Sequence, residues 1–152
     1  RGAIDATEWV GPYDDERLGF HKIAERYYYP GWWEPGAMLS FYVNEKAWSE
    51  LSSDQQAMFR AAATEASTRM TAKYDAVNPP ALKRLIDGGT RLMPFPADVM
   101  EAAEKASFDL YEEQAAADAG YRKIYEAFRA VRTDAYRWSS VSETAYGAFA
   151  IR

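Results

Sequence analysis

The sequence contains no cysteine and only one histidine, His21. The absence of cysteine excludes disulfide bonds, zinc–thiolate sites and catalysis by a thiol nucleophile. It is compatible with the cytoplasm and with a bacterial periplasm, so it does not decide the compartment. His21 has no serine nucleophile motif nearby and no evident base to pair with, which favours a structural role over a catalytic one. These residues therefore offer no evident catalytic constellation.

Long apolar runs and clusters of basic residues are also missing. The longest apolar run, 37–43, is interrupted by Ser40 and is far shorter than the roughly 20 residues that a membrane-spanning helix needs. The 18 Lys and Arg residues are scattered and the net charge is −5, so no nucleic-acid partner is expected. Of the residues, 48% are hydrophobic, which is enough for a domain core.

The first residues of the chain resemble the interior of a larger fold. Arg1 leads, without an initiator Met or a signal segment, into a strand-like run that ends at Glu8 and Trp9 before Gly11-Pro12. We therefore expect a fragment, whose few strands would pair with preceding chain, a second copy or a partner. A carboxylate beside an indole at a strand end suits the edge of a ligand or cation site. The alternative, a surface Glu and a core Trp, is favoured on base rates.

The next part of the chain predicts a helix, a loop and a strand. The helix begins at Pro12, with the acidic residues 14–16 at its positive end, and stops at the Tyr-Tyr-Pro segment 28–30. A turn-rich loop follows over 31–36. The apolar run 37–43 is predicted to be a strand covered on both faces.

The clearest helix start lies at Ser52 or Ser53, where Gln55 or Gln56 can close a capping box. A long helix follows, with an apolar stripe at spacings of three and four that comprises Met58, Phe59, Ala62, Ala66, Met70, Tyr74 and Val77. The Asn-Pro-Pro segment 78–80 is expected to kink or end it, although a helical face resumes up to the glycines 88–89. A short strand is predicted over 90–95, and helices from there almost to the end of the chain.

Two motifs carry a resemblance to a known family. The motifs are Glu-Trp-Val-Gly-Pro at 8–12 and Pro-Gly-Trp-Trp-Glu at 30–34, and they are followed by Asn44, Trp48 and Leu51 before a long helix. Together they resemble the C-terminal part of TRAP transporter solute-binding subunits of the DctP type, most closely their α-keto acid-binding branch. The resemblance covers nearly the whole chain, and the joint occurrence of the two motifs is its specific feature.

The resemblance implies a helix-rich α/β fold, the C-terminal part of a two-lobed periplasmic-binding-protein-like clamp with a long lobe-spanning helix. Residues 1–51 would form part of the ligand-binding lobe and the hinge. Residues 52–88 would form the spanning helix region. Residues 89–152 would supply a strand and C-terminal helices that could mediate homodimerisation. The arginine that clamps the ligand carboxylate in this family would precede Arg1.

By the same resemblance, the protein is a non-catalytic periplasmic subunit that captures a 2-oxo acid such as pyruvate and delivers it to membrane permease subunits. A monovalent cation, usually sodium, would bridge protein and ligand, bound by the Glu8 side chain and the Trp9 carbonyl, with Glu34 as a second candidate ligand. Trp9, Trp32 and Trp33 would wall the site, although packing against the preceding tyrosines is an equal alternative for Trp32 and Trp33. The alternative function is a helical interaction or assembly module whose apolar stripes bind a partner.

Overall fold

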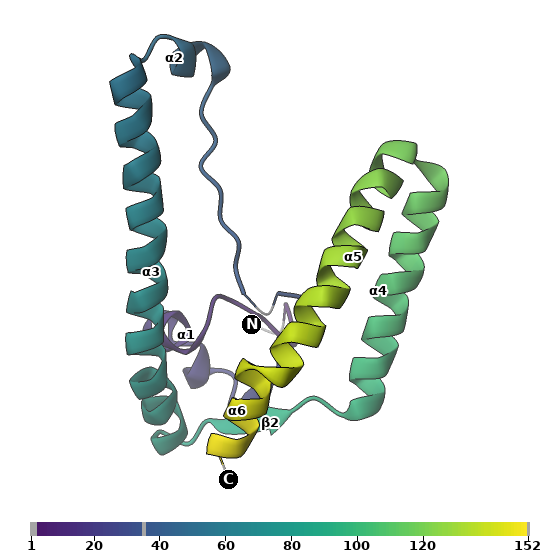
Figure 1. The fold of residues 1–152 in the computed structure, drawn as a ribbon. Helices are drawn as coiled ribbons and strands as arrows, with labels where there is room; N and C mark the ends of the chain where they lie inside the picture. The colour runs from purple at the N-terminus through teal and green to yellow at the C-terminus, as the bar shows by residue number, and fades with distance from the viewer. Residues whose placement is uncertain (1–2, 35, 152) are drawn as a thin grey trace. The chain divides into compact units, whose positions relative to one another are not determined.

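The computed structural model of this chain describes residues 3–34 and 36–151 (Figure 1). Its elements are α1 (Pro12–Leu18), the 3-10 helix η1 (Phe20–Lys22), β1 (Arg26–Tyr29), α2 (Glu45–Ser49), α3 (Ser53–Asp87), β2 (Arg91–Pro94), α4 (Ala97–Ala117), α5 (Ala119–Val141) and α6 (Glu143–Ala150). The chain divides into two compact units between Phe95 and Pro96. The prediction of a helix-rich α/β fold is confirmed.

The long helix α3 begins at the predicted capping box. The Ser52 hydroxyl accepts a hydrogen bond from the Gln55 backbone N–H at 3.2 Å, and the Gln55 side-chain oxygen accepts one from the Ser52 N–H at 2.9 Å. The helix is 35 residues long, continues through Pro79 and Pro80, and ends at Gly88. The helical pattern on both sides of the two prolines therefore belongs to one element.

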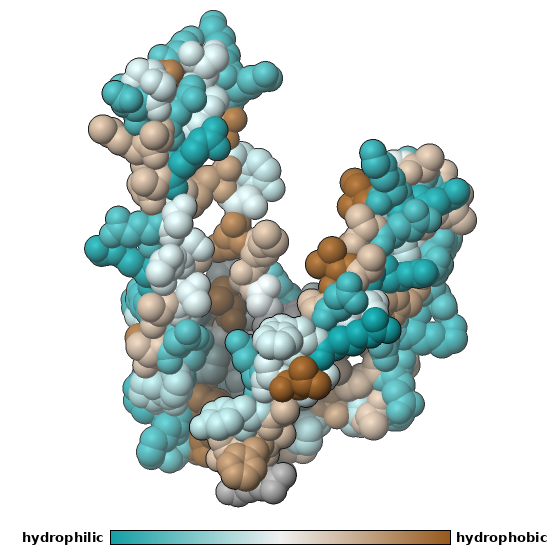
Figure 2. All heavy atoms as spheres, viewed as in Figure 1, coloured by the Kyte–Doolittle hydropathy of each residue, from teal (hydrophilic) through white to brown (hydrophobic). Residues whose placement is uncertain are grey.

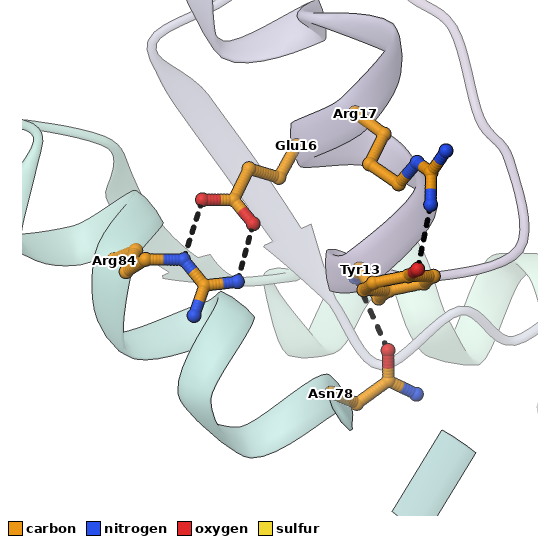
Figure 3. A network of polar contacts seen from close by, with 5 residues as sticks. All are labelled: Tyr13, Glu16, Arg17, Asn78 and Arg84. Carbon is orange, nitrogen blue, oxygen red and sulfur yellow. Dashed lines mark hydrogen bonds and ion pairs between the residues drawn. The ribbon is translucent and has the colours of Figure 1, made fainter. Parts of the chain in front are cut away.

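Helix α1 is anchored on α3 by polar contacts (Figure 3). The N-cap residue of α1, Gly11, has no side chain with which to cap the helix. Asn78 of α3 supplies the missing acceptor, because its side-chain oxygen accepts a hydrogen bond from the Tyr13 N–H at 3.1 Å. Arg84 donates two hydrogen bonds to Glu16, at 2.7 and 2.6 Å. The direction of α1 is thus fixed by a helix that lies more than 60 residues further along the chain.

The helix predicted from Pro12 is shorter than expected. It ends at Leu18 because Gly19 adopts the left-handed conformation (φ 77°, ψ 22°) and its N–H donates to the carbonyls of Asp15 and Glu16. Residues 26–29, which include the two tyrosines predicted to stop the helix, instead form β1, and this strand pairs in parallel with β2. The predicted strand over 90–95 is confirmed as β2.

Two predicted strands are wrong. The described residues of the opening run, 3–9, and the segment 37–43 contain no strand. The segment 37–43 runs as extended chain towards α2 (Figure 1), and Met38 and Tyr42 are 91% and 94% exposed. A strand requires a paired neighbour, and β1 with β2 form the one sheet among the described residues. An apolar composition alone does not provide that neighbour.

The second unit is a hairpin of α4 and α5, followed by α6 (Figure 1). The Asp118 carboxylate accepts the Tyr121 N–H at 2.6 Å and so caps α5. The Arg122 side chain donates to the Ala115 carbonyl at 2.7 Å, which satisfies a free carbonyl at the end of α4. Ala115 and Tyr125 are buried between the helices, each 6% exposed.

Large apolar side chains remain exposed along α5 and α6, and Figure 2 shows hydrophobic residues along α5. Those that are more than half exposed are Ile124, Phe128, Val131, Tyr136, Trp138, Val141, Tyr146 and Phe149. By contrast, four hydrophobic residues are buried among the described residues of the whole chain: Ala81, Leu85, Ala115 and Tyr125. Most apolar surface of the second unit is therefore open to contact.

Candidate ligand and cation site

The predicted site residues lie on two segments of the first unit. Glu8 and Trp9 belong to the irregular segment that leads into α1. The second segment, 32–34, lies in the loop that follows β1 and the cis Tyr29–Pro30 bond. One hydrogen bond joins the two segments: the Trp33 indole N–H donates to Oε2 of Glu8 at 3.2 Å. The fold therefore brings together a carboxylate and an indole that are 25 residues apart.

The Trp33 ring also belongs to an aromatic cluster of Tyr28, Trp32, Trp33 and Phe95. Trp32 meets Trp33 edge to face, with ring centres 5.6 Å apart, and Trp33 meets Phe95 in the same way at 5.9 Å. Phe95 stacks on Tyr28 at 5.1 Å. Such contacts fix the orientation of the rings, and Trp32 and Trp33 are still 41% and 45% exposed. The cluster thus orients the indoles and leaves part of each one exposed.

Two predicted site residues, Trp9 and Glu34, are not joined to this group by side-chain contacts of these kinds in the described part of the chain. Within residues 3–34 and 36–151, the side chains of Trp9 and Glu34 form no hydrogen bond, ion pair or ring contact with the other three, and both are exposed. Their assignment to the site stays a prediction. His21, expected to be structural, lies in η1.

The described residues offer hard oxygen donors for a cation. Oε2 of Glu8 accepts the Trp33 hydrogen bond and leaves the second carboxylate oxygen free to bind, and the Trp9 carbonyl follows directly in the chain. No group of three acidic or histidine side chains that could hold a metal exists in the described part of the chain. Calcium takes six to eight oxygens. The arrangement therefore fits a cation that completes its coordination with oxygens of a bound anion, of water or of other protein segments.

A buried carboxylate, Asp15, lies on α1. Asp15 is 5% exposed, and its Oδ2 accepts a hydrogen bond from the Tyr27 hydroxyl at 2.5 Å. Burial raises the pKa of Asp15, as do the charges of Asp14 and Glu8, and the Tyr27 hydrogen bond partly opposes that rise. Burial and the same bond raise the pKa of the Tyr27 phenol. Sequence reasoning explained Asp15 by the helix dipole alone, as one of the acidic residues in the first turn of the helix, and gave no signal of its burial.

Comparison with known proteins identifies the family. Residues 1–118 match the family model DctP, described as bacterial extracellular solute-binding protein, family 7. The chain belongs to this family. This DctP-family chain is 51% identical over 150 residues to a monocarboxylate 2-oxoacid-binding periplasmic protein of Nostoc, a match that covers 99% of the chain and 41% of the relative. The chain thus spans less than half the length of that curated relative.

Three solved structures of TRAP transporter solute-binding proteins share the fold of the DctP-family chain. The protein from Bordetella bronchiseptica, a dimer with calcium and picolinate, is 45% identical with a TM-score of 0.91 over 99% of this chain and 45% of its own. The Colwellia psychrerythraea protein, with calcium and pyruvate, is 37% identical with a TM-score of 0.90 (95% and 44% covered). The Pseudoalteromonas atlantica protein, with sodium and pyruvate, is 37% identical with a TM-score of 0.88 (94% and 44%).

These comparisons confirm the resemblance read from the two motifs and the predicted fold class. Among the described residues, no helix combines the length and the hydrophobicity needed to cross a membrane. The predicted division at residues 51 and 88 stays a prediction.

Proposed function

We propose that the full-length protein is a periplasmic solute-binding subunit of a TRAP transporter that binds a 2-oxo acid together with a hard metal cation and delivers it to membrane permease subunits. It performs no catalysis in this role. Family membership and relatives with pyruvate beside calcium or sodium support the proposal. The observation that carries it in this chain is the hydrogen bond from the Trp33 indole to the Glu8 carboxylate, which brings the two predicted site segments together.

The chemistry explains why a cation is needed. A 2-oxo acid presents a carboxylate oxygen and a keto oxygen side by side, and hard cations prefer such oxygens. Glu8 alone would repel an anionic ligand, whereas a cation bound to Glu8 cancels that repulsion and attracts the ligand. In this arrangement Glu8 binds the cation through its side chain and Trp9 through its carbonyl, and Glu34 is a second candidate ligand.

The indoles have a separate role in this proposal. Trp9, Trp32 and Trp33 would wall the site and exclude water, which strengthens the attraction between the cation and the anion. The edge-to-face contact of Trp32 with Trp33 and the contact of Trp33 with Phe95 support a pre-formed wall.

We further propose that the protein forms a homodimer through its C-terminal helices. Eight large apolar side chains of α5 and α6 are more than half exposed, exposed apolar patches mark protein contact sites, and the Bordetella relative is a dimer. A helical assembly module without a small-molecule ligand would use the same surface, but family membership favours the solute-binding subunit.

Calorimetry of the full-length protein tests the proposed function. The protein is stripped of metal with a chelator and titrated with pyruvate in a buffer free of sodium, and then again with added sodium or calcium. We expect measurable pyruvate binding only when a cation is present. Propionate, which lacks the keto oxygen, serves as the control and should bind more weakly. Equal pyruvate affinity with and without cations would contradict the proposal.

A further inference from the structure

The proposed site is assembled from two segments with little direct support for each other. Glu8 and Trp9 precede α1, whereas Trp32, Trp33 and Glu34 follow β1. The direct link between them is the exposed hydrogen bond from Trp33 to Glu8 at 3.2 Å. Solvent competes for such a bond, so it contributes little to holding two segments together. A site shared by both segments needs α1 and β1 to be fixed relative to each other.

The anchors described so far do this only indirectly, through α3 and β2. Asn78 and Arg84 attach α1 to α3, and the ladder bonds attach β1 to β2. The bond from the Tyr27 hydroxyl to Asp15 links α1 directly to β1. Among the described residues it is the only hydrogen bond or ion pair between these two elements.

We propose that Asp15 and Tyr27 are positioning residues of the ligand and cation site. Their bond holds the Glu8–Trp9 segment and the Trp32–Glu34 segment at the separation that a shared cation and anion require. This inference rests on the proposed function. It assigns a role to two side chains that are not expected to touch the ligand.

The burial of Asp15 makes this link strong and difficult to replace. Only 5% of the surface of Asp15 is exposed. Oδ1 of Asp15 has no hydrogen-bond donor among the described residues, so Tyr27 is the one described donor to this side chain. Removal of the Tyr27 hydroxyl leaves a buried carboxylate without a donor, which costs more than the loss of an exposed bond. The local structure must then shift to hydrate Asp15, and the two segments move with it.

The chain offers a closely matched control. The Tyr74 hydroxyl donates to Oδ2 of Asp14 at 2.7 Å. Tyr74→Phe therefore removes a tyrosine hydroxyl that is bonded to an aspartate of α1, as Tyr27→Phe does. The difference is that Tyr74 lies on α3 and does not join the two site segments. Both variants should lower the unfolding temperature.

The test compares pyruvate binding by calorimetry in the full-length protein, with calcium saturating and with calcium removed. We expect Tyr27→Phe to weaken pyruvate binding in calcium by about tenfold, the lower end for a lost bond to a charged group. The factor by which calcium raises pyruvate affinity should fall as well. Tyr74→Phe should leave both quantities near those of the unsubstituted protein. Asp15→Asn, whose amide oxygen still accepts from Tyr27, should also retain them.

Each of the other outcomes overturns either the positioning role of Asp15 and Tyr27 or the proposed function. Unchanged binding in Tyr27→Phe, with a lowered unfolding temperature, shows that the bond is structural only and overturns the inference. Equal losses in Tyr27→Phe and Tyr74→Phe overturn it too, because the effect is then not specific to the link with β1. If Tyr27→Phe does not fold, a tenfold loss in Asp15→Asn still contradicts a role based on the hydrogen bond. Absence of pyruvate binding by the unsubstituted protein contradicts the proposed function, and the inference falls with it.

Discussion

Replacement of Glu8 by glutamine isolates the charge of the proposed cation ligand. The amide oxygen of glutamine can still accept the Trp33 indole N–H that now bonds to Oε2 of Glu8. The contact between the two segments is therefore kept, and one negative charge is lost. The same change at Glu113, an exposed residue of α4, provides the control.

The expected loss follows from the exposure of Glu8. Because the Glu8 side chain is exposed before ligand and indoles close around it, the dielectric constant of water, about 80, with calcium–oxygen distances of about 2.4 Å, gives the minimum loss. The lost attraction is then about 1.7 kcal/mol for a monovalent cation and about 3.5 kcal/mol for a divalent one. These energies correspond to about 20-fold and about 350-fold weaker binding. Calcium binding should thus suffer far more than sodium binding.

Calorimetric titration of the full-length variant with calcium, with sodium and with pyruvate measures these changes. By linkage, pyruvate binding in the presence of a cation must weaken together with cation binding. Glu113→Gln should change neither. Unchanged affinities for both cations in Glu8→Gln would refute the assignment of Glu8 as a ligand. Equal losses for sodium and calcium would refute the electrostatic reasoning.

Three further predictions concern stability and assembly. Asn78→Ala should lower the free energy of unfolding by about 1 kcal/mol, seen as a drop of about 2–4 °C in thermal unfolding, because the Tyr13 N–H loses its acceptor; no change would show that water replaces the cap. The pKa of Asp15 is raised in the folded state. Its favourable contribution to the free energy of unfolding is therefore complete below the ordinary aspartate pKa of about 3.9 and is lost as the pH rises through the higher folded pKa. As the pH rises from acidic to neutral, Asp15→Asn should therefore gain stability relative to the unsubstituted protein. A difference in the free energy of urea unfolding between the two proteins that does not change with pH would contradict this. Truncation at Gly120 should convert a dimer to a monomer in light scattering, whereas a monomer before and after truncation would rule out dimerisation through α5 and α6.

Features set by neighbouring residues were predictable from the sequence. The capping box of Ser52 and Gln55 and the end of α3 at Gly88 depend on contacts within one turn of helix, and both are confirmed. The strand before Pro94 was also found. The segment 37–43 was not predictable in this way, because strand formation depends on a neighbour and not on composition. The tyrosine run that forms β1 was read as a helix end, although aromatic residues favour strands.

In the candidate site too, local motifs could be predicted and contacts between distant segments could not. The local motif around Glu8 and the loop around Trp33 are visible in the sequence, and the resemblance rests on both. Their contact over 25 residues follows from the fold and has no local signal. The burial of Asp15 against Tyr27 and the capping of α1 by Asn78 are likewise tertiary. Sequence reasoning could therefore name the proposed ligands but not the residues that position them.

The most direct test of the account is a crystal structure of the full-length protein with pyruvate and calcium bound. We predict one calcium ion within about 2.3–2.6 Å of a Glu8 carboxylate oxygen and the Trp9 carbonyl oxygen, in contact with the carboxylate and keto oxygens of pyruvate. A calcium ion bound elsewhere, or pyruvate held without any contact to a cation, would contradict the assignment of Glu8 and Trp9 as cation ligands.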